Sequence, residues 1–149
     1  MFRVLSNGVC RGIASSLSLV EAQRLVRRTC QFCKEEVALP AEFVAQVQKE
    51  LADITEENWP KDLNRNSLSF YRGKGCPRCG GIGYKGRLVV DEVFSIDETM
   101  QELMVNRFPM EKVRAQAQKQ GMLLIRQDGF LKAARGLTTV EEVLRATQS

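Results

Sequence analysis

The stretch CPRCGGIGYKG, from Cys76 to Gly86, holds two cysteines two residues apart, and four of the next seven residues are glycine. Glycine loses more backbone freedom on folding than any other residue, so this density indicates a turn that needs its special conformations. A second pair, Cys30 and Cys33, has the same spacing and is separated from the first by forty-two residues. The pattern predicts that two cysteine-containing turns meet in the folded chain.

Two Cys-x2-Cys turns supply four sulfurs for one tetrahedral ion, with Zn–S distances of about 2.3 Å. The chain has no histidine, so all four ligands must be sulfur. A site closed by four protein ligands has no open position for catalysis, so we expect a structural zinc ion. Sulfur ligands are also found at iron and iron–sulfur sites, which keeps iron as an alternative. The expected metal ligands are Cys30, Cys33, Cys76 and Cys79.

Composition narrows the class of protein. The 149 residues are 44% apolar and 27% charged, which suits a globular chain with a real core. No apolar run approaches the roughly 18–20 residues that cross a bilayer, and the N-terminus lacks a signal-peptide pattern. We therefore expect a cytosolic protein, where stable disulfides are rare and paired cysteines serve metal or redox chemistry. The fifth cysteine, Cys10, is expected to pack as a small apolar residue.

Several catalytic schemes are excluded. Without histidine, neither a Ser-His-Asp nor a Cys-His hydrolase is possible. No G-x-x-x-x-G-K-[ST] phosphate loop occurs, because GKG at 73–75 lacks its spacing and hydroxyl partner. We assign no catalytic and no cofactor-binding residue, and expect no nucleotide hydrolysis by this chain alone.

The net charge of +4 is unevenly distributed: +5 over 1–34, −6 over 35–64, +6 over 65–87 and −1 over 88–149. The two basic blocks contain the two cysteine pairs. Four thiolates around a divalent ion carry a charge of −2, which nearby cations offset. This compensation weakens the argument for a nucleic-acid partner. The cations expected to offset the thiolate charge are Arg27, Arg28, Lys34, Arg78, Lys85 and Arg87.

Strands are predicted on both sides of the second cysteine pair. Residues 67–74 alternate in polarity, and 87–96 are rich in β-branched residues. Segment 19–29 fits one face of a helix and also one face of a strand, and periodicity alone leaves both open.

The rest of the chain is predicted to be mainly helical. Residues 11–18 are expected to form a short helix, and Pro40 to open another that extends to about Asp53, followed by a polar loop over 54–67. The apolar stripe of the Pro40 helix is Phe43, Val44, Val47 and Leu51.

The last third is expected to contain four helices. Asp97 is a candidate N-cap for the first, which extends to about Arg107, and Pro109 begins the second, closed by Gly121. The third begins at Met122 or Gln127 and is closed by Gly136. A capping box of Thr138 and Glu141 begins the fourth. The side chains expected to face a core are Met100, Leu103, Met104, Met110, Val113, Ala117, Val140, Val143 and Leu144.

Three segments carry a family resemblance: GIASSLSLVEAQRLVRRTCQFCK, YRGKGCPRCGGIGYKGR and KQGMLLIRQDGFLKAARGLTTVEEVLRAT. In this order they resemble the ATPases that drive type II secretion and type IV pilus assembly. The resemblance implies that the four cysteines form the family's tetracysteine metal-binding motif. It further implies that 1–29 is the tail of a RecA-like ATPase core, with 19–29 a strand, that 30–96 is the metal-binding subdomain and that 97–149 is the C-terminal helical subdomain. The expected class is α+β: a small zinc-knuckle subdomain with short strands, then a C-terminal bundle of about four helices.

The family's phosphate loop and its acidic and histidine-containing motifs lie upstream of these segments and do not occur here. Residues 10–12 also depart from the family, which usually has an acidic residue, proline and a bulky apolar residue there. The resemblance therefore implies a fragment of a hexameric ATPase that binds ATP and Mg²⁺ only as the full-length parent. It implies a cytoplasmic protein, peripheral to the inner membrane through its partners and not inserted in it. Those partners are neighbouring ATPase subunits and an inner-membrane platform protein.

Two other functions are compatible with parts of the sequence. An independent nucleic-acid-binding zinc ribbon is favoured by the basic block 65–87, with Phe70 and Tyr71 as stacking groups, but the acidic stretch 35–64 opposes it. A thiol oxidoreductase ranks third, because a thioredoxin-type cysteine pair works alone and leaves the second pair unexplained.

Overall fold

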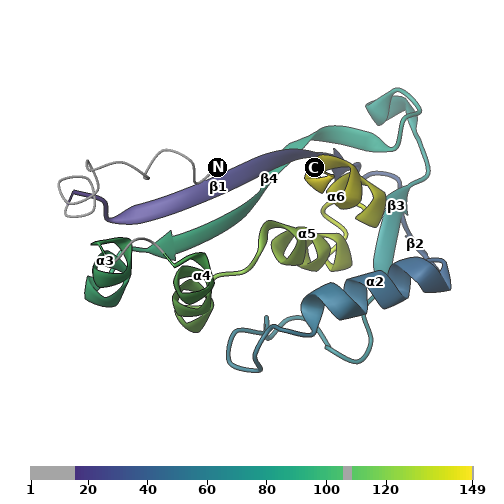
Figure 1. Cartoon of the computed structure of the whole chain (residues 1–149). Helices are drawn as coiled ribbons and strands as arrows, with labels where there is room; N and C mark the ends of the chain where they lie inside the picture. The colour runs from purple at the N-terminus through teal and green to yellow at the C-terminus, as the bar shows by residue number, and fades with distance from the viewer. Residues whose placement is uncertain (1–15, 106–108, 149) are drawn as a thin grey trace. The chain divides into compact units, whose positions relative to one another are not determined.

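The computed structural model describes residues 16–105 and 109–148 (Figure 1). Its short strands and five helices confirm the predicted α+β class. The predicted helix over 11–18 lies mostly outside the described residues, and Cys10 lies outside them altogether. The elements are β1 (Leu19–Thr29), β2 (Lys34–Val37), α2 (Ala41–Leu51), β3 (Phe70–Gly73), the 3-10 helix η1 (Pro77–Cys79), β4 (Tyr84–Ser95), α3 (Glu98–Val105), α4 (Met110–Lys119), α5 (Ile125–Ala134) and α6 (Val140–Thr147).

The strands form two separate two-stranded sheets. β1 pairs with β4, so segment 19–29 is a strand, as the family resemblance implied. β2 pairs antiparallel with β3, in a register that places Lys34 opposite Gly73 and Val37 opposite Phe70. β4 begins at Tyr84, three residues before the predicted start at 87, and it includes Gly86, whose φ is +82°.

The described chain divides into two compact units. The first comprises the residues up to Ala22 together with Glu92–Leu123, and contains α3 and α4. The second comprises Gln23–Asp91 and the residues from Leu124 onward, and contains α2, α5 and α6. The division into 1–29, 30–96 and 97–149 stays a prediction.

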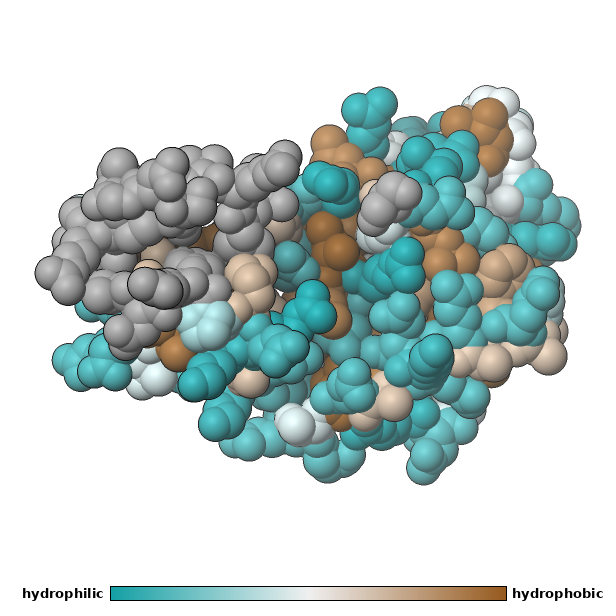
Figure 2. All heavy atoms as spheres, viewed as in Figure 1, coloured by the Kyte–Doolittle hydropathy of each residue, from teal (hydrophilic) through white to brown (hydrophobic). Residues whose placement is uncertain are grey.

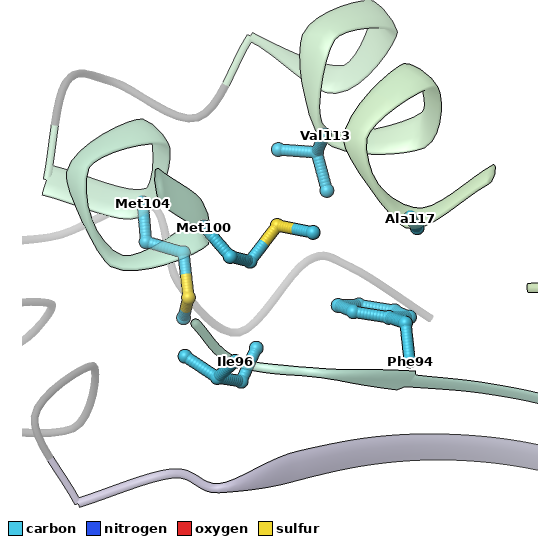
Figure 3. Close-up of a cluster of buried hydrophobic side chains, with 6 residues drawn as sticks. All are labelled: Phe94, Ile96, Met100, Met104, Val113 and Ala117. Atoms are coloured by element: carbon cyan, nitrogen blue, oxygen red, sulfur yellow. The ribbon is translucent and has the colours of Figure 1, made fainter. Parts of the chain in front are cut away.

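The first unit is held together by a small apolar core at the end of β4 (Figure 3). Met104 points toward Ile96, and Met100 extends between Val113 and Phe94. Asp97 caps α3 as predicted, because its Oδ1 accepts the Met100 N–H at 2.7 Å. The expectation that Met110 faces the core is wrong. It opens α4 on the solvent side and is 49% exposed.

Replacing Met100 with alanine is expected to destabilise this unit by about 2–3 kcal/mol, because the side chain is fully buried and its removal leaves a cavity. Hydrogen exchange of the α3 and α4 amides measures the loss. Met110→Ala is the matched control, and its exposed side chain should change protection by less than about 0.5 kcal/mol. Equal protection in the two variants would show that this core does not hold the helices.

In the second unit, α5 lies between α2 and α6 (Figure 1). Phe130 and Leu131 of α5 are fully buried. Gly129 permits the close packing of α6, because a Cβ there would meet the side chain of Val143. Of the stripe predicted for α2, Val47 and Leu51 are buried, whereas Phe43 and Val44 are half-buried.

The capping box predicted for Thr138 and Glu141 does not form, and α6 begins with an N-cap one residue later. Thr139 is the N-cap, and its Oγ1 accepts the Glu142 N–H at 3.3 Å. Thr138 instead donates to the backbone oxygen of Arg27 at 2.9 Å, and the Thr29 N–H donates to Leu137 O at 2.9 Å. The loop before α6 therefore pairs with an edge of β1.

The described helices include none that is long and apolar enough to cross a bilayer. The face seen in Figure 2 is mostly hydrophilic over the coloured residues, with small separate hydrophobic areas.

Candidate metal centre

The two cysteine turns lie where the strands of the two sheets end. Cys30 and Cys33 lie in the turn that joins β1 to β2, and Cys76 and Cys79 lie in the turn that joins β3 to β4. The pairing of β2 with β3 brings the two turns together, since Lys34 follows Cys33 directly and lies opposite Gly73. Two cysteine pairs with forty-two residues between them therefore converge because of strand pairing.

The four sulfurs are spaced as the ligands of one ion. The Sγ–Sγ distances are 3.9 Å from Cys30 to Cys76, 3.9 Å from Cys33 to Cys79 and 3.7 Å from Cys76 to Cys79. All four sulfurs lie within 4.8 Å of one another. A regular tetrahedron with Zn–S bonds of about 2.3 Å has edges of about 3.8 Å, whereas a disulfide needs about 2.05 Å. The thiols are free, and they are positioned to bind a metal ion.

Backbone N–H groups point at two of these sulfurs. Gly75 N donates to Cys33 Sγ at 3.3 Å, and Cys76 N and Gly83 N donate to Cys79 Sγ at 3.2 and 3.3 Å. Burial raises the pKa of the Cys79 thiol, but these two N–H donors, together with hydrogen bonds from the Cys76 and Cys33 thiols, outweigh it and lower that pKa to about 6. Burial raises the pKa of Cys33 to about 12. The donors thus offset part of the charge that four thiolates would bring to the site.

The two turns are also joined through their backbones. Cys30 N donates to Gly83 O at 2.9 Å, and Lys74 N donates to Cys33 O at 2.9 Å. Gly73 and Gly83 approach so closely that a Cβ on either would overlap with the carbonyl of the other. Gly83 has a φ of +77°, and Gly80, which precedes it in the turn, has +63°. Glycine is therefore required at this turn for its φ and also for space.

Gly83→Ala is expected to cost about 2–3 kcal/mol and to weaken metal binding, because the new methyl meets the backbone that joins the turns. Urea unfolding and chelator competition measure the two effects. The control is Gly80→Ala, which has a similar φ but open space, and should cost about 1 kcal/mol. Equal losses of stability and metal binding in the two variants would show that the close approach of the turns does not contribute to stability.

The cations predicted to surround the site take different partners. Arg78 lies over the ring of Phe32 at 4.0 Å, and Lys85 lies 5.9 Å from it. Phe32 itself is 60% exposed. Arg27 pairs with Glu142, at 2.6 Å between Nη2 and Oε1, and stacks on Tyr84. Arg27 therefore has a carboxylate partner of its own, in addition to any effect on the thiolates.

The aromatic residues proposed to stack on nucleic-acid bases are not both available. Phe70 is only 7% exposed and belongs to the core of the second unit. Tyr71 is half-buried, with the Lys34 ammonium 4.9 Å from its ring centroid. The structure thus removes Phe70 from the set of exposed rings on which the nucleic-acid alternative rested.

Residues 2–145 match the family model described as Type II/IV secretion system protein. The chain belongs to this family. The match covers almost the whole chain, and it confirms the resemblance to secretion and pilus ATPases that three of its segments indicated.

Curated relatives of this secretion-system family member include two proteins named Type IV pilus assembly ATPase PilB. That of Thermus thermophilus is 36% identical over 135 residues, 91% of this chain, and that of Pseudomonas aeruginosa is 33% identical over 147 residues, 98% of this chain. The Type II secretion system ATPase E of Vibrio cholerae is 37% identical over 140 residues, 91% of this chain. The chain spans only 14% of the length of the first relative and 24% of the other two.

Sequence reasoning found all four cysteines of the cluster but missed the role of Gly73. In the sequence, GKG at 73–75 matches only part of a phosphate loop, whereas in the structure Gly73 lies against Gly83 and Gly75 N donates to Cys33 Sγ. The sequence signal for the role of Gly73 is that this second glycine-containing segment lies directly beside a cysteine pair.

Proposed function

We propose that this chain is a zinc-stabilised C-terminal module of a hexameric ATPase that powers type IV pilus assembly or type II protein secretion. The observation that carries the proposal is the tetrahedral spacing of four sulfurs in a member of this family. The relatives named as pilus assembly and secretion ATPases support the class of motor. The proposed ligands are Cys30, Cys33, Cys76 and Cys79.

The proposed role of the ion is structural, because four sulfur ligands leave it no position for water or substrate. When bound, it supplies a cross-link between the two cysteine turns. The chain's own residues connect that cross-link to four strands, since each turn joins a strand of one sheet to a strand of the other. Strain applied to β1 is thereby transmitted to β2, β3 and β4 through a short rigid junction.

Nucleotide chemistry is assigned to the full-length protein. This chain lacks a phosphate loop, which supports the proposal that it does not hydrolyse ATP alone and that ATP and Mg²⁺ bind elsewhere in the parent. In the proposed hexamer the module transmits movement to a neighbouring subunit or to an inner-membrane platform protein. Its proposed location is the cytoplasm, peripheral to the inner membrane through these partners.

A chimera tests the proposal. Residues 19–148 of this chain replace the matching segment of the Pseudomonas aeruginosa pilus assembly ATPase in a strain that lacks the native protein. Surface pili are then counted, and zinc is measured in the purified chimera. We expect pili to form, with one zinc ion per chain.

The matched variant of the chimera carries Cys30→Ser and Cys33→Ser. It should lose zinc and surface pili, although the hydrolytic core is unchanged. Normal piliation in this variant would overturn the proposal that a metal cross-link between the two cysteine turns is required. Absence of pili from an unsubstituted chimera that is folded and zinc-loaded would count against pilus assembly, and restored secretion in a type II system would then select the other motor.

A further inference from the structure

Three arginines from three different elements line one open hollow in the second unit. They are Arg27 of β1, Arg87 of β4 and Arg145 of α6. The hollow has a volume of 540 Å³, and its remaining lining residues are Leu25 and Val26. No acidic side chain is among the described residues that line it.

A buried carboxylate fixes two of these arginines. Glu142 is 2% exposed, and its oxygens accept from Arg27 Nη2 at 2.6 Å and from Arg145 Nε and Nη2 at 2.9 Å each. Arg27 also stacks on the ring of Tyr84, with its Cζ 4.1 Å from the ring centroid. Both guanidinium groups are therefore held in place at the hollow, although their side chains remain about half exposed.

The charges at this hollow do not balance. Three guanidinium groups face one carboxylate, which leaves an excess of two positive charges. The Arg87 side chain is exposed, and it makes no ion pair or hydrogen bond with the described residues. Each guanidinium has five N–H donors, and Glu142 takes only some of those on Arg27 and Arg145. Guanidinium N–H donors and two excess positive charges therefore remain available to bind a ligand.

We propose that this hollow binds the phosphoryl group of an anionic ligand. The planar guanidinium fork matches the oxygens of a phosphate, and two excess positive charges match a doubly charged phosphoryl group. Fixing Arg27 and Arg145 through Glu142 lowers the entropy lost on binding. The proposal goes beyond the structural role of the metal centre, because it gives a ligand to a face that this role leaves without one.

Isothermal titration of the zinc-loaded chain with inorganic pyrophosphate at low ionic strength tests the site. We expect saturable one-to-one binding that weakens as salt is added. Arg87→Ser should weaken it at least about ten-fold, because a charge-assisted contact is lost without disturbing an ion pair. Arg114→Ser, an exposed arginine of α4 outside the hollow, is the control and should bind as the unchanged chain does. Zinc content and far-UV circular dichroism after titration show that both variants remain folded and loaded.

A second arm distinguishes free phosphates from phospholipid headgroups. Vesicles of phosphatidylcholine with one-third phosphatidylglycerol are sedimented with the same three proteins. Pyrophosphate binding without vesicle binding assigns a soluble ligand, and vesicle binding that depends on Arg87 assigns a headgroup. Absence of saturable binding in both arms, or equal binding by the Arg87→Ser and Arg114→Ser variants, overturns the proposal.

Discussion

Replacing Cys79 with serine is expected to abolish stoichiometric metal binding and to lower the thermal unfolding midpoint by at least about 10 °C. Cys79 is 8% exposed, and its sulfur lies 3.7 Å from that of Cys76 and 3.9 Å from that of Cys33. A serine hydroxyl is a poor zinc ligand and leaves only three sulfurs. Because the unfolded chain has no preformed site, the lost binding free energy is lost from folding. Elemental analysis and scanning calorimetry measure both effects.

The control is Cys10→Ala, which removes the one cysteine outside the quartet and keeps a small apolar side chain there. It should keep one metal ion per chain and an unchanged midpoint. Chelation of the unsubstituted chain should reproduce the loss seen for Cys79→Ser. A metal-free chain that melts at the same temperature as the loaded one would show that strand pairing alone holds the two turns together.

Local features of the fold could be read from the sequence. The Cys-x2-Cys turns, the positive φ values of the glycine turn and the Asp97 cap each depend on residues within a few positions of one another. The helix predicted from Pro40 extends from Ala41 to Leu51 for the same reason. Where residues close in sequence supply the stabilising interactions, the sequence pattern is sufficient to predict the local structure.

β2 escaped prediction because its sequence, KEEV, has no strand pattern of its own. Its residues alternate between exposed and half-buried, and its stability comes from pairing with β3, more than thirty residues away. The sequence also left open whether 19–29 is a helix or a strand, because pairing with the distant strand β4 decides between them. Strand propensity reports packing partners more than intrinsic preference, and the partners here are distant.

The N-cap of α6 was misplaced by one residue because the sequence offers two registers. Only half of a capping box forms, since the Glu142 side chain binds Arg27 and Arg145. Thr138 and Thr139 are consecutive, as are Glu141 and Glu142, so either pair satisfies the local pattern. Arg27, 115 residues from Glu142, decides between them by binding the second glutamate. The site that carries our further inference was invisible in the sequence for the same reason.

Glu142→Gln is therefore expected to destabilise the second unit by about 3–4 kcal/mol at pH 7. Burial raises the pKa of Glu142, but the guanidinium groups of Arg145 and Arg27 outweigh it and lower that pKa from 4.5 to about 2. The amide cannot neutralise these arginines, and it replaces one acceptor of the Arg27 N–H and side-chain bonds with a donor. Urea unfolding of both proteins measures the difference.

The pH dependence separates lost charge from lost packing. A carboxylate whose pKa is lowered by folding stabilises the native state above its unfolded pKa of about 4.5, and that contribution disappears as pH falls from 4.5 to about 2. The gap between the unsubstituted chain and Glu142→Gln should thus be constant from pH 8 to 6 and shrink below pH 4.5. Metal release in acid affects both proteins, so their difference is the quantity to follow. Glu141→Gln, at the exposed neighbouring glutamate, should change stability by less than about 0.5 kcal/mol at every pH. A gap for Glu142→Gln that stayed the same down to pH 3 would mean that shape, and not the buried charge, fixes the two arginines.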